Sequence, residues 1–287
     1  MNNLGWSLPA AASSYAQSID FGIWLIHAAM VGIFAMWGAF FVYLLVKYRA
    51  RPGVPAVRED HADTPAHISV PDSFSKFPFA QLLYRNKGEL KSLIPDMIIM
   101  AFEIALIFFY AIPVWNKVKM SVPEEKDQVL IEIVAEQFAW NVHYAGPDGK
   151  LGSRKAELVH FSNPIGLDRS DPAAADDVVM GNELRLPVDK LAVFKLRSKD
   201  VIHSFFVPEF RIKQDLVPGL EIPMWIRPTK TGKFEIACAQ LCGFAHALMR
   251  GDAIVQTQDE FDAWYKSRLA ANPAAASTKP ANPSEDF

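Results

Sequence analysis

Cysteine is almost absent from this 287-residue chain, which contains only Cys238 and Cys242. At most one disulfide bond can therefore form within it. Charge is nearly balanced as well: the formal net charge is -3, which gives no electrostatic case for a nucleic-acid partner. No internal repeat is evident, so a repeat architecture is not indicated.

Charged residues are missing from one long stretch. Residues 21–46 contain no Asp, Glu, Lys or Arg, and 26 helical residues are long enough to cross a bilayer core of about 30 Å. A second apolar run begins at residue 93 and is interrupted only by Asp96 and Glu103. We therefore predict transmembrane helices over residues 21–46 and 93–115.

Basic residues are distributed unevenly around these spans. Residues 1–20 contain no Lys or Arg, whereas the segment from Lys47 to Lys91 contains eight. The positive-inside bias predicts that the loop 47–92 is cytoplasmic. A short arm, residues 1–20, and everything after the second span would then be external, which is periplasmic in a bacterial cell. The small residues 10–14 of this arm are a candidate processing site.

Two polar side chains lie inside the predicted spans. A carboxylate in a membrane helix is costly, so we expect Glu103 to face a protein partner or a polar cavity and not lipid. His27 can remain neutral and hydrogen-bonded at modest cost. Two helices offer few ways to satisfy such groups, which indicates that the chain belongs to a larger membrane complex.

Residues 116–268 are predicted to form an external all-β domain. Short β-branched and aromatic runs alternate with turn signals, which is typical of a sandwich or barrel. Residues 150–180 are rich in Gly, Pro, Asp, Ser and Ala and are expected to form an extended surface loop. A short helix over residues 261–270 is expected near the end of the domain, and residues 269–287 are expected to be disordered. The predicted strands are residues 129–134, 137–144, 183–196, 201–207, 221–226, 233–237 and 251–256.

The chemistry is concentrated in one loop, which holds Cys238, Cys242, His246 and Met249 at steps of four, four and three. Thiolate, thioether and imidazole donors together suit copper. A disulfide is the simplest alternative in an exported domain, although a bridge over three residues gains little loop-closure entropy. Structural zinc is the third possibility, in which Met249 would be a core residue. Spacing alone favours copper, and the three interpretations remain open.

A further donor is expected from a neighbouring strand. His203 lies 35 residues before Cys238, in an apolar segment that a strand end would bury. Its alternative role is that of a hydrogen-bonded core histidine.

The chain resembles subunit II of haem-copper cytochrome c oxidases. The loop has the pattern Cys-x-x-x-Cys-Gly-x-x-His-x-x-Met, and the segments Asp200-Val-Ile-His203-Ser and Lys213-Gln-Asp215-Leu-Val-Pro-Gly219 precede it in the family order. The resemblance covers nearly the whole chain, including the two helices. It implies two transmembrane helices in a hairpin and an external cupredoxin-like β domain.

The resemblance also implies a dinuclear copper centre, CuA. Cys238 and Cys242 would bridge the two coppers, His203 and His246 would each cap one copper, and Met249 would be a weak thioether ligand. The backbone carbonyl of Gln240 would be the remaining ligand. Bridging thiolates on a rigid scaffold keep reorganisation small, so the implied role is an electron relay.

Three positions depart from the usual family pattern. Gln240 replaces a glutamate that also binds an interface magnesium or manganese ion, so that ion is in doubt here. Phe138 occupies the position of an electron-entry tryptophan, with Trp140 two residues later on the expected strand. Glu89 is the candidate for a proton-path carboxylate, and its alternative is a solvated loop charge.

The implied function is electron entry from cytochrome c, or from a cytochrome c domain, toward haem in subunit I. There oxygen would be reduced to water with proton pumping, so the chain would act as an oxidase subunit without holding the reaction site. Its partners would be subunit I, other oxidase subunits and the lipid bilayer. A quinol oxidase subunit II is an alternative but lacks the copper ligands. The second alternative is a structural or metal-storage module, in which the loop forms a disulfide or binds zinc.

Overall fold

A computed structural model describes residues 8–53 and 93–271 and divides the chain into two units. One unit contains residues 22–114, and the other contains residues 1–21 together with 115–287. Glu89 and most of the tail 269–287 lie outside the described residues.

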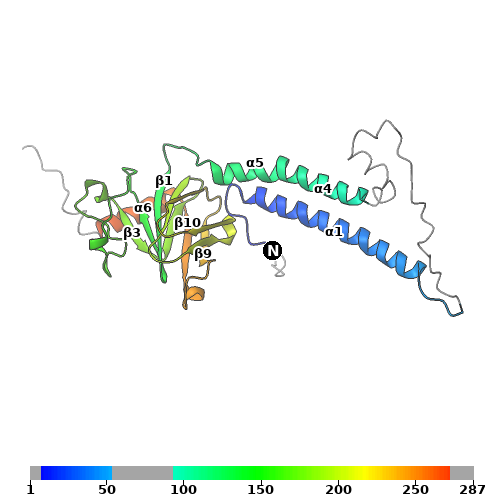
Figure 1. Ribbon diagram of the computed structural model, residues 1–287. Helices are drawn as coiled ribbons and strands as arrows, with labels where there is room; N and C mark the ends of the chain where they lie inside the picture. The colour runs from blue at the N-terminus through cyan, green and yellow to red at the C-terminus, as the bar shows by residue number, and fades with distance from the viewer. Residues whose placement is uncertain (1–7, 54–92, 272–287) are drawn as a thin grey trace, which may run out of the picture. The chain divides into compact units, whose positions relative to one another are not determined.

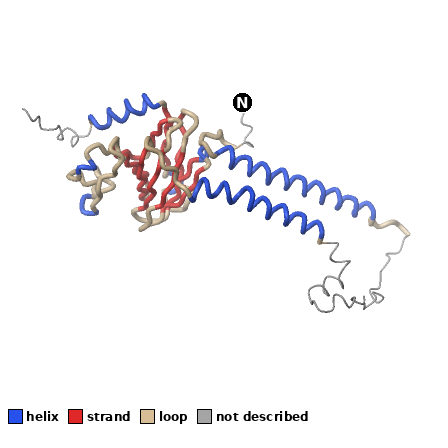
Figure 2. Tube along the Cα trace, turned by 90° about the horizontal axis from the view of Figure 1, so that it is seen from above, coloured by secondary structure: helices blue, strands red, loops and turns tan. Residues whose placement is uncertain are grey.

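The first unit is built from long apolar helices. Helix α1 spans Ala16–Lys47, and a second helical stretch runs from Ile94 to Met120 through α4 (Ile94–Leu106), η3 (Ile107–Ala111), α5 (Ile112–Trp115) and η4 (Asn116–Met120). Figures 1 and 2 both show α1 and α4 side by side. Helix α1 and η3 approach closely at Gly22, where an added Cβ would lie 2.9 Å from the Tyr110 ring. Both stretches are long and apolar enough to cross a membrane.

The helices are longer than the sequence predicted. Helix α1 begins at Ala16 and not at residue 21. Ala16 is buried, and its packing stabilises a helical turn before the uncharged run starts. The second stretch continues past residue 115, because polar residues after the apolar run, such as Asn116 and Lys117, can maintain a helical backbone. Glu103 is exposed on α4, and His27 is hydrogen-bonded within α1, with Nδ1 2.7 Å from the Ile23 carbonyl.

The second unit is a sandwich of two five-stranded sheets, as the sequence predicted. The first sheet has the order β3-β2-β1-β5-β8, in which only β1 and β5 are parallel neighbours. The second has the order β4-β10-β9-β6-β7, with β10 and β4 parallel. The strands are β1 Val129–Glu136, β2 Ala139–Tyr144, β3 Val178–Gly181, β4 Glu183–Pro187, β5 Ala192–Ser198, β6 His203–Val207, β7 Ile212–Leu216, β8 Ile222–Ile226, β9 Gly232–Cys238 and β10 Arg250–Gln256.

The core lies between the two sheets because the strands alternate. On β1, Ile131, Ile133 and Ala135 are fully buried in the main core, which Trp140 and Phe205 also fill. The expected strand 183–196 is two strands, β4 and β5, which belong to different sheets. The sequence did not predict strands β3 and β7. Strand β3 is very short, and β7 is interrupted by exposed polar residues.

Residues 146–177, which we call the excursion, cover the outer face of the first sheet. The excursion contains only two short helical turns, η5 (Ala156–Leu158) and η6 (Pro172–Ala174). It is nevertheless anchored, because Ile165, Leu167 and Ala174 pack with Val134 of β1 in a second small core. The backbone of this segment is extended, as predicted, but some of its side chains are buried against the sheet.

The N-terminal arm is part of the β domain. Ala12 and Tyr15 are buried in the main core, and Ser13 forms an isolated bridge with Pro228. Arg211 binds the Asp20 carboxylate with two nitrogens, at 2.6 and 3.0 Å. Within the candidate processing site at residues 10–14, Ala12 and Ser13 are buried in the folded domain, whereas Ala10 and Ser14 are exposed.

The domain ends in helix α6, Gln258–Ala270, two residues beyond the expected domain limit of 268. Thr257 and Glu260 cap its first turn reciprocally, which fixes where the helix begins. Phe261, Trp264 and Tyr265 are buried against the domain and hold the helix in place.

Candidate metal centre

Two neighbouring strand ends bring the first donors together. His203 begins β6, Cys238 ends β9, and the two strands pair through Phe205 opposite Cys238. In this arrangement His203 Nδ1 lies 4.0 Å from Cys238 Sγ. His203 is fully buried at this strand end.

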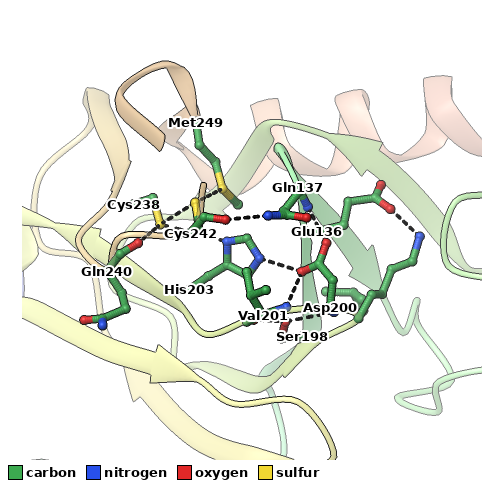
Figure 3. Close-up of polar contacts among 12 residues, drawn as sticks. Glu136, Gln137, Ser198, Asp200, Val201, His203, Cys238, Gln240, Cys242 and Met249 are labelled. Atoms are coloured by element: carbon green, nitrogen blue, oxygen red, sulfur yellow. Dashed lines mark hydrogen bonds and ion pairs between the residues drawn. The ribbon is translucent and has the colours of Figure 1, made fainter. Parts of the chain in front are cut away.

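The loop after β9 returns to the same point. The sulfur atoms of Cys238 and Cys242 are 3.8 Å apart, and both cysteines are free and buried. The reactive atoms of His203, Cys238 and Cys242 all lie within 4.8 Å of one another. Figure 3 shows the imidazole and the two sulfur atoms facing a common space.

The remaining two side-chain donors come from the turn η8, His246–Leu248, and the residue after it. His246 Nδ1 lies 3.6 Å from Cys242 Sγ, and Met249 Sδ lies 3.8 Å from the same sulfur. Met249 is almost fully buried, while His246 is partly exposed. One imidazole is therefore enclosed by the fold and the other lies at its surface.

Gln240 contributes its backbone to the site. Its carbonyl oxygen lies 3.2 Å from Cys238 Sγ, whereas its side chain is exposed. Figure 3 shows the amide turned away from the sulfur atoms. Six donors predicted from the sequence are thus gathered in one place.

The donor chemistry fits a soft metal ion. Burial and the neighbouring Cys238 thiol raise the pKa of the Cys242 thiol to about 11. Two adjacent thiolates need compensating positive charge, which a bound cation provides. The combination of two thiols, two imidazoles and a thioether matches the preferences of copper.

Asp200 supports the site from behind His203. Its Oδ1 lies 2.8 Å from His203 Nε2, and its Oδ2 accepts the backbone N–H of Gln137 at 2.7 Å. Although partial burial opposes ionisation, the hydrogen bonds from His203, Gln137 and Val201 lower the pKa of Asp200. Sequence reasoning gave Asp200 no role of its own, although its place three residues before His203 was a usable signal.

Gln137 ties the metal loop to the first sheet. Its side-chain amide donates to the Cys242 carbonyl at 2.5 Å. Gly243 follows at φ +144°, where an added Cβ would come within 2.9 Å of Gln137 and Phe138 atoms. This close approach had no signal in the sequence apart from the glycine itself.

The two aromatic candidates are placed differently. Phe138 lies in the turn before β2 and is partly exposed, with its ring edge-to-face on Phe244 at 4.9 Å. Trp140 is on β2 and fully buried, with its ring 6.2 Å from that of His203. Phe138 is therefore reachable by a partner, whereas Trp140 lies between the core and the metal site. Only Trp140 is on a strand, because β2 begins at Ala139 and Phe138 precedes it.

Comparisons with known proteins agree with this geometry. Residues 129–257 match the family model of the periplasmic domain of cytochrome c oxidase subunit II. The alternative cytochrome c oxidase subunit 2 of Bradyrhizobium diazoefficiens is 43% identical over 156 residues, which are 54% of this chain and 55% of that protein. The haem-copper oxidase subunit 2 of Aeropyrum pernix is 28% identical over 233 residues, or 80% of each chain.

Part of the chain is also similar to a solved structure. The crystal structure of the periplasmic domain of cytochrome oxidase subunit II of Bradyrhizobium japonicum is 28% identical, covers 53% of this chain and 99% of that one, and has a TM-score of 0.39. The chain spans about half the length of the first curated relative that it matches, and 29%, 26% and 57% of the next three. The family-model match covers residues 129–257 of the β-sandwich, so in this domain the chain is similar to the periplasmic domain of cytochrome c oxidase subunit II.

Proposed function

We propose that this chain is the electron-entry subunit of a terminal haem-copper oxidase and holds a dinuclear copper centre. The observation that carries the proposal is the convergence of His203, Cys238 and Cys242 within 4.8 Å, with Met249 sulfur 3.8 Å from Cys242. When bound, copper supplies one-electron redox chemistry. The role of the chain is to hold the ligands and the path to them.

Each residue has a distinct part in this proposal. Cys238 and Cys242 would bridge the two ions, His203 and His246 would each bind one, and Met249 and the Gln240 carbonyl would complete the set. Burial of the sulfur atoms excludes water from them. Strand pairing and the contacts of Gln137 and Asp200 keep the ligands in place, which favours a small reorganisation energy.

The proposed path begins at the partly exposed Phe138 and passes the metal centre toward haem in subunit I. Trp140 is an interior candidate, because it packs edge-on against His203. The donor is cytochrome c or a cytochrome c domain of a partner complex. Oxygen reduction and proton pumping would take place in subunit I, with Glu89 as the candidate carboxylate at the mouth of a proton path.

The interface magnesium or manganese ion is the weakest part of the family pattern here. Gln240 offers a neutral amide oxygen, which is a poorer ligand for a hard cation than a carboxylate. We therefore propose that copper binding does not depend on that ion.

The proposed location of the protein is supported by its two apolar helices and by the family that its β domain matches. The two long apolar helices fit an integral membrane protein, and the matched family model is that of a periplasmic domain. We propose that both termini and the β domain are external to a bacterial inner membrane, with residues 47–92 cytoplasmic, since basic residues are concentrated there.

Electron paramagnetic resonance of the oxidised full-length protein, with copper counted per chain, tests the proposal. We expect two coppers per chain and a mixed-valence signal shared by both. Cys242→Ser should abolish the shared signal because a bridging thiolate is lost. Ser204→Ala, at a buried position beside His203 that carries no proposed ligand, is the matched control and should retain the signal.

Three results would contradict the proposal. The first is a sample containing zinc without copper, and the second is a stable bond between Cys238 and Cys242 in the isolated protein. The third is an undisturbed dinuclear signal in Cys242→Ser, which would refute the bridging role.

A further inference from the structure

A histidine lies on the outer face of the first sheet, beneath the excursion. Strands β1 and β2 pair with Glu132 opposite His143. The neighbours of His143 on β2, Val142 and Tyr144, belong to the main core, so alternation places His143 on the other face. His143 is nevertheless fully buried, because the excursion covers that face.

Both ring nitrogens of His143 face carboxylates. Nδ1 lies 3.2 Å from Oε2 of Glu132, and Nε2 lies 2.6 Å from Oδ2 of Asp177. Both carboxylates are buried as well. An ionised carboxylate only accepts hydrogen bonds, so the two contacts together require an N–H group on each nitrogen. This arrangement therefore suits the protonated imidazolium form of His143.

The same two carboxylates hold the first half of the excursion. Oε1 of Glu132 forms an ion pair with Arg154 at 3.0 Å. Oδ2 of Asp177 accepts the backbone N–H of Gly152 at 2.8 Å. The excursion is thus joined to the sheet through two acidic groups that share one imidazole ring.

Other charges lie behind these carboxylates and do not face the ring. Among the described residues, Glu132 and Asp177 are the titratable groups next to His143, and β3 places the apolar Val179 opposite it. On the side of Glu132, β5 and β8 contribute Arg197, which pairs with Glu132 at 3.0 Å, and Lys195 and Glu221. On the side of Asp177 lie Arg169, Asp148 and Asp176.

Two buried tyrosines near the cluster are not expected to titrate with His143. The Tyr144 hydroxyl contacts the backbone of Arg185, and the Tyr265 hydroxyl donates to the Asp176 carbonyl at 2.6 Å. Burial raises the pKa of both hydroxyls. His143 is therefore the group of this cluster that changes charge first as the pH rises above neutrality.

Loss of the His143 proton must break one of the two contacts. Burial opposes the charged ring, but its hydrogen bonds to the carboxylates and their charges raise its pKa. A neutral imidazole has a single N–H group, which should stay on Nε2 because that contact is the shorter. The Nδ1 lone pair then faces a buried oxygen of Glu132, which is costly and displaces the carboxylate that holds Arg154.

The other anchors of the excursion are few. Its apolar contacts with the sheet form a small core in which Ile165, Leu167 and Ala174 pack on Val134. Lys199 adds a hydrogen bond to the Pro164 carbonyl at 2.8 Å. A segment with so little buried apolar surface can open locally without unfolding of the main core.

We propose that the excursion is a pH-sensitive cover of the first sheet, which protonated His143 holds closed and which opens at alkaline pH. Opening releases one proton from the imidazole to solvent and changes no covalent bond. The two sheets stay paired, because their shared core lies on the opposite face of β1 and β2. The proposal is independent of the proposed function, since none of these groups is a proposed copper ligand.

Hydrogen–deuterium exchange of the full-length protein in detergent, at pH values from about 6 to about 10, tests the proposal. Each observed rate is divided by the intrinsic rate at the same pH. Protection of residues 150–171 should fall by about tenfold or more across this range, since a shift of one pKa unit corresponds to a tenfold change. Protection of β6 and β9 should stay constant, and the copper-free protein should give the same result.

Three variants connect this response to the ring. His143→Gln cannot become charged, so the excursion should be poorly protected at every pH and its pH response should vanish. Arg154→Gln keeps the histidine but removes the ion pair to Glu132, so its response should be smaller, and it provides the test if His143→Gln does not fold. His160→Gln, at an exposed histidine of the excursion, is the matched control and should respond like the unmodified protein.

Constant protection of residues 150–171 between pH 6 and 10 in the unmodified protein would overturn the proposal. A simultaneous and equal loss in β6 and β9 would also overturn it, because the event would then be global unfolding. An undiminished response in His143→Gln or in Arg154→Gln would show that the alkaline opening does not arise from this cluster.

Discussion

His203 Nε2 lies 2.8 Å from the Oδ1 atom of Asp200, while His203 Nδ1 lies 4.0 Å from the sulfur of Cys238. An ionised carboxylate can only accept hydrogen bonds, and the hydrogen bonds at Asp200 lower its pKa. The imidazole proton must then be on Nε2, which leaves the lone pair of Nδ1 directed toward the sulfur atoms. Asp200 thus selects the tautomer that can bind a metal.

Replacing Asp200 with Asn should weaken copper binding without removing a ligand. An amide can present either an oxygen or an N–H group to His203, so the tautomer is no longer fixed. Loss of such a supporting contact typically costs about 10- to 100-fold in metal affinity. Competition with a copper chelator would measure this, and Asp127→Asn, at an exposed position before β1, should have no effect. Equal affinities for the two variants would refute the positioning role.

Local sequence spacing predicted the proximity of most residues of the candidate metal site. Cys238, Cys242, His246 and Met249 lie in one loop, so their proximity is set by twelve residues of chain. His203 could be added because an apolar strand end buries its histidine. The contacts that support these ligands are of another kind, since they depend on which strands pair.

Gln137 illustrates what the sequence could not predict. It precedes Cys242 by 105 residues and meets that residue's carbonyl only because the β1–β2 turn lies beside the metal loop. Pairing of β1 with β5 and of β6 with β9 creates this proximity, and no periodic pattern encodes it. Trp140 is similar, since alternation predicts a face of the strand but not whether that face is covered.

The two long helices, unlike the supporting contacts of the metal site, could be predicted from local sequence. Their composition alone was sufficient to place both, because an apolar run of membrane length with few or no charges has few other interpretations. Their ends were less certain. Helix α1 begins five residues earlier than predicted, and Ala16, its first residue, is fully buried within the β domain's own unit.

Met249→Leu should keep copper bound but raise the reduction potential of the centre. The thioether sulfur is 3.8 Å from Cys242 Sγ, and a leucine of similar volume would fill the buried space without donating electrons. Potentiometric titration of the copper signal would measure the change. Met224→Leu is the matched control, because Met224 is equally buried on β8 but belongs to the core away from the donors. A similar shift in both variants would show that the effect comes from packing.

A buried histidine outside the metal site makes stability depend on pH. His143 is fully buried, with Nδ1 3.2 Å from Glu132 and Nε2 2.6 Å from Asp177. Burial opposes its charged form, but the hydrogen bonds that His143 makes to these two carboxylates outweigh burial and raise its pKa. Arg154 and Arg197 also face Glu132, whose pKa is lowered by His143 and by these arginines despite burial.

The sign of the pH dependence follows from these directions. A raised histidine pKa contributes stability that is fully present below about pH 6.5, its ordinary value, and is lost as the pH rises through the folded value. His143→Gln should therefore flatten the alkaline side of the stability curve. It should also lower stability by about 3–5 kcal/mol, since two carboxylates lose their buried cation.

Denaturant unfolding at several pH values, monitored by the fluorescence of buried Trp264, would measure this. His160→Gln, at an exposed histidine in the excursion, should behave like the unmodified protein. An identical pH profile for His143→Gln and the unmodified protein would rule out the buried histidine as the cause.

The arm before α1 should be needed for the stability of the β domain. Tyr15 is almost fully buried, lies edge-to-face on Trp225 at 5.3 Å, and donates its hydroxyl to the Trp225 carbonyl at 3.3 Å. Tyr15→Ala removes the ring and should destabilise the domain by about 3–5 kcal/mol, whereas Tyr15→Phe removes only the long hydrogen bond and should cost about 1 kcal/mol. Limited proteolysis gives a second measure. The segment around the buried Ala12 and Ser13 should resist cleavage in the unmodified protein and in Tyr15→Phe but be cut rapidly in Tyr15→Ala. Equal cleavage of all three proteins would show that the arm is not held by this ring.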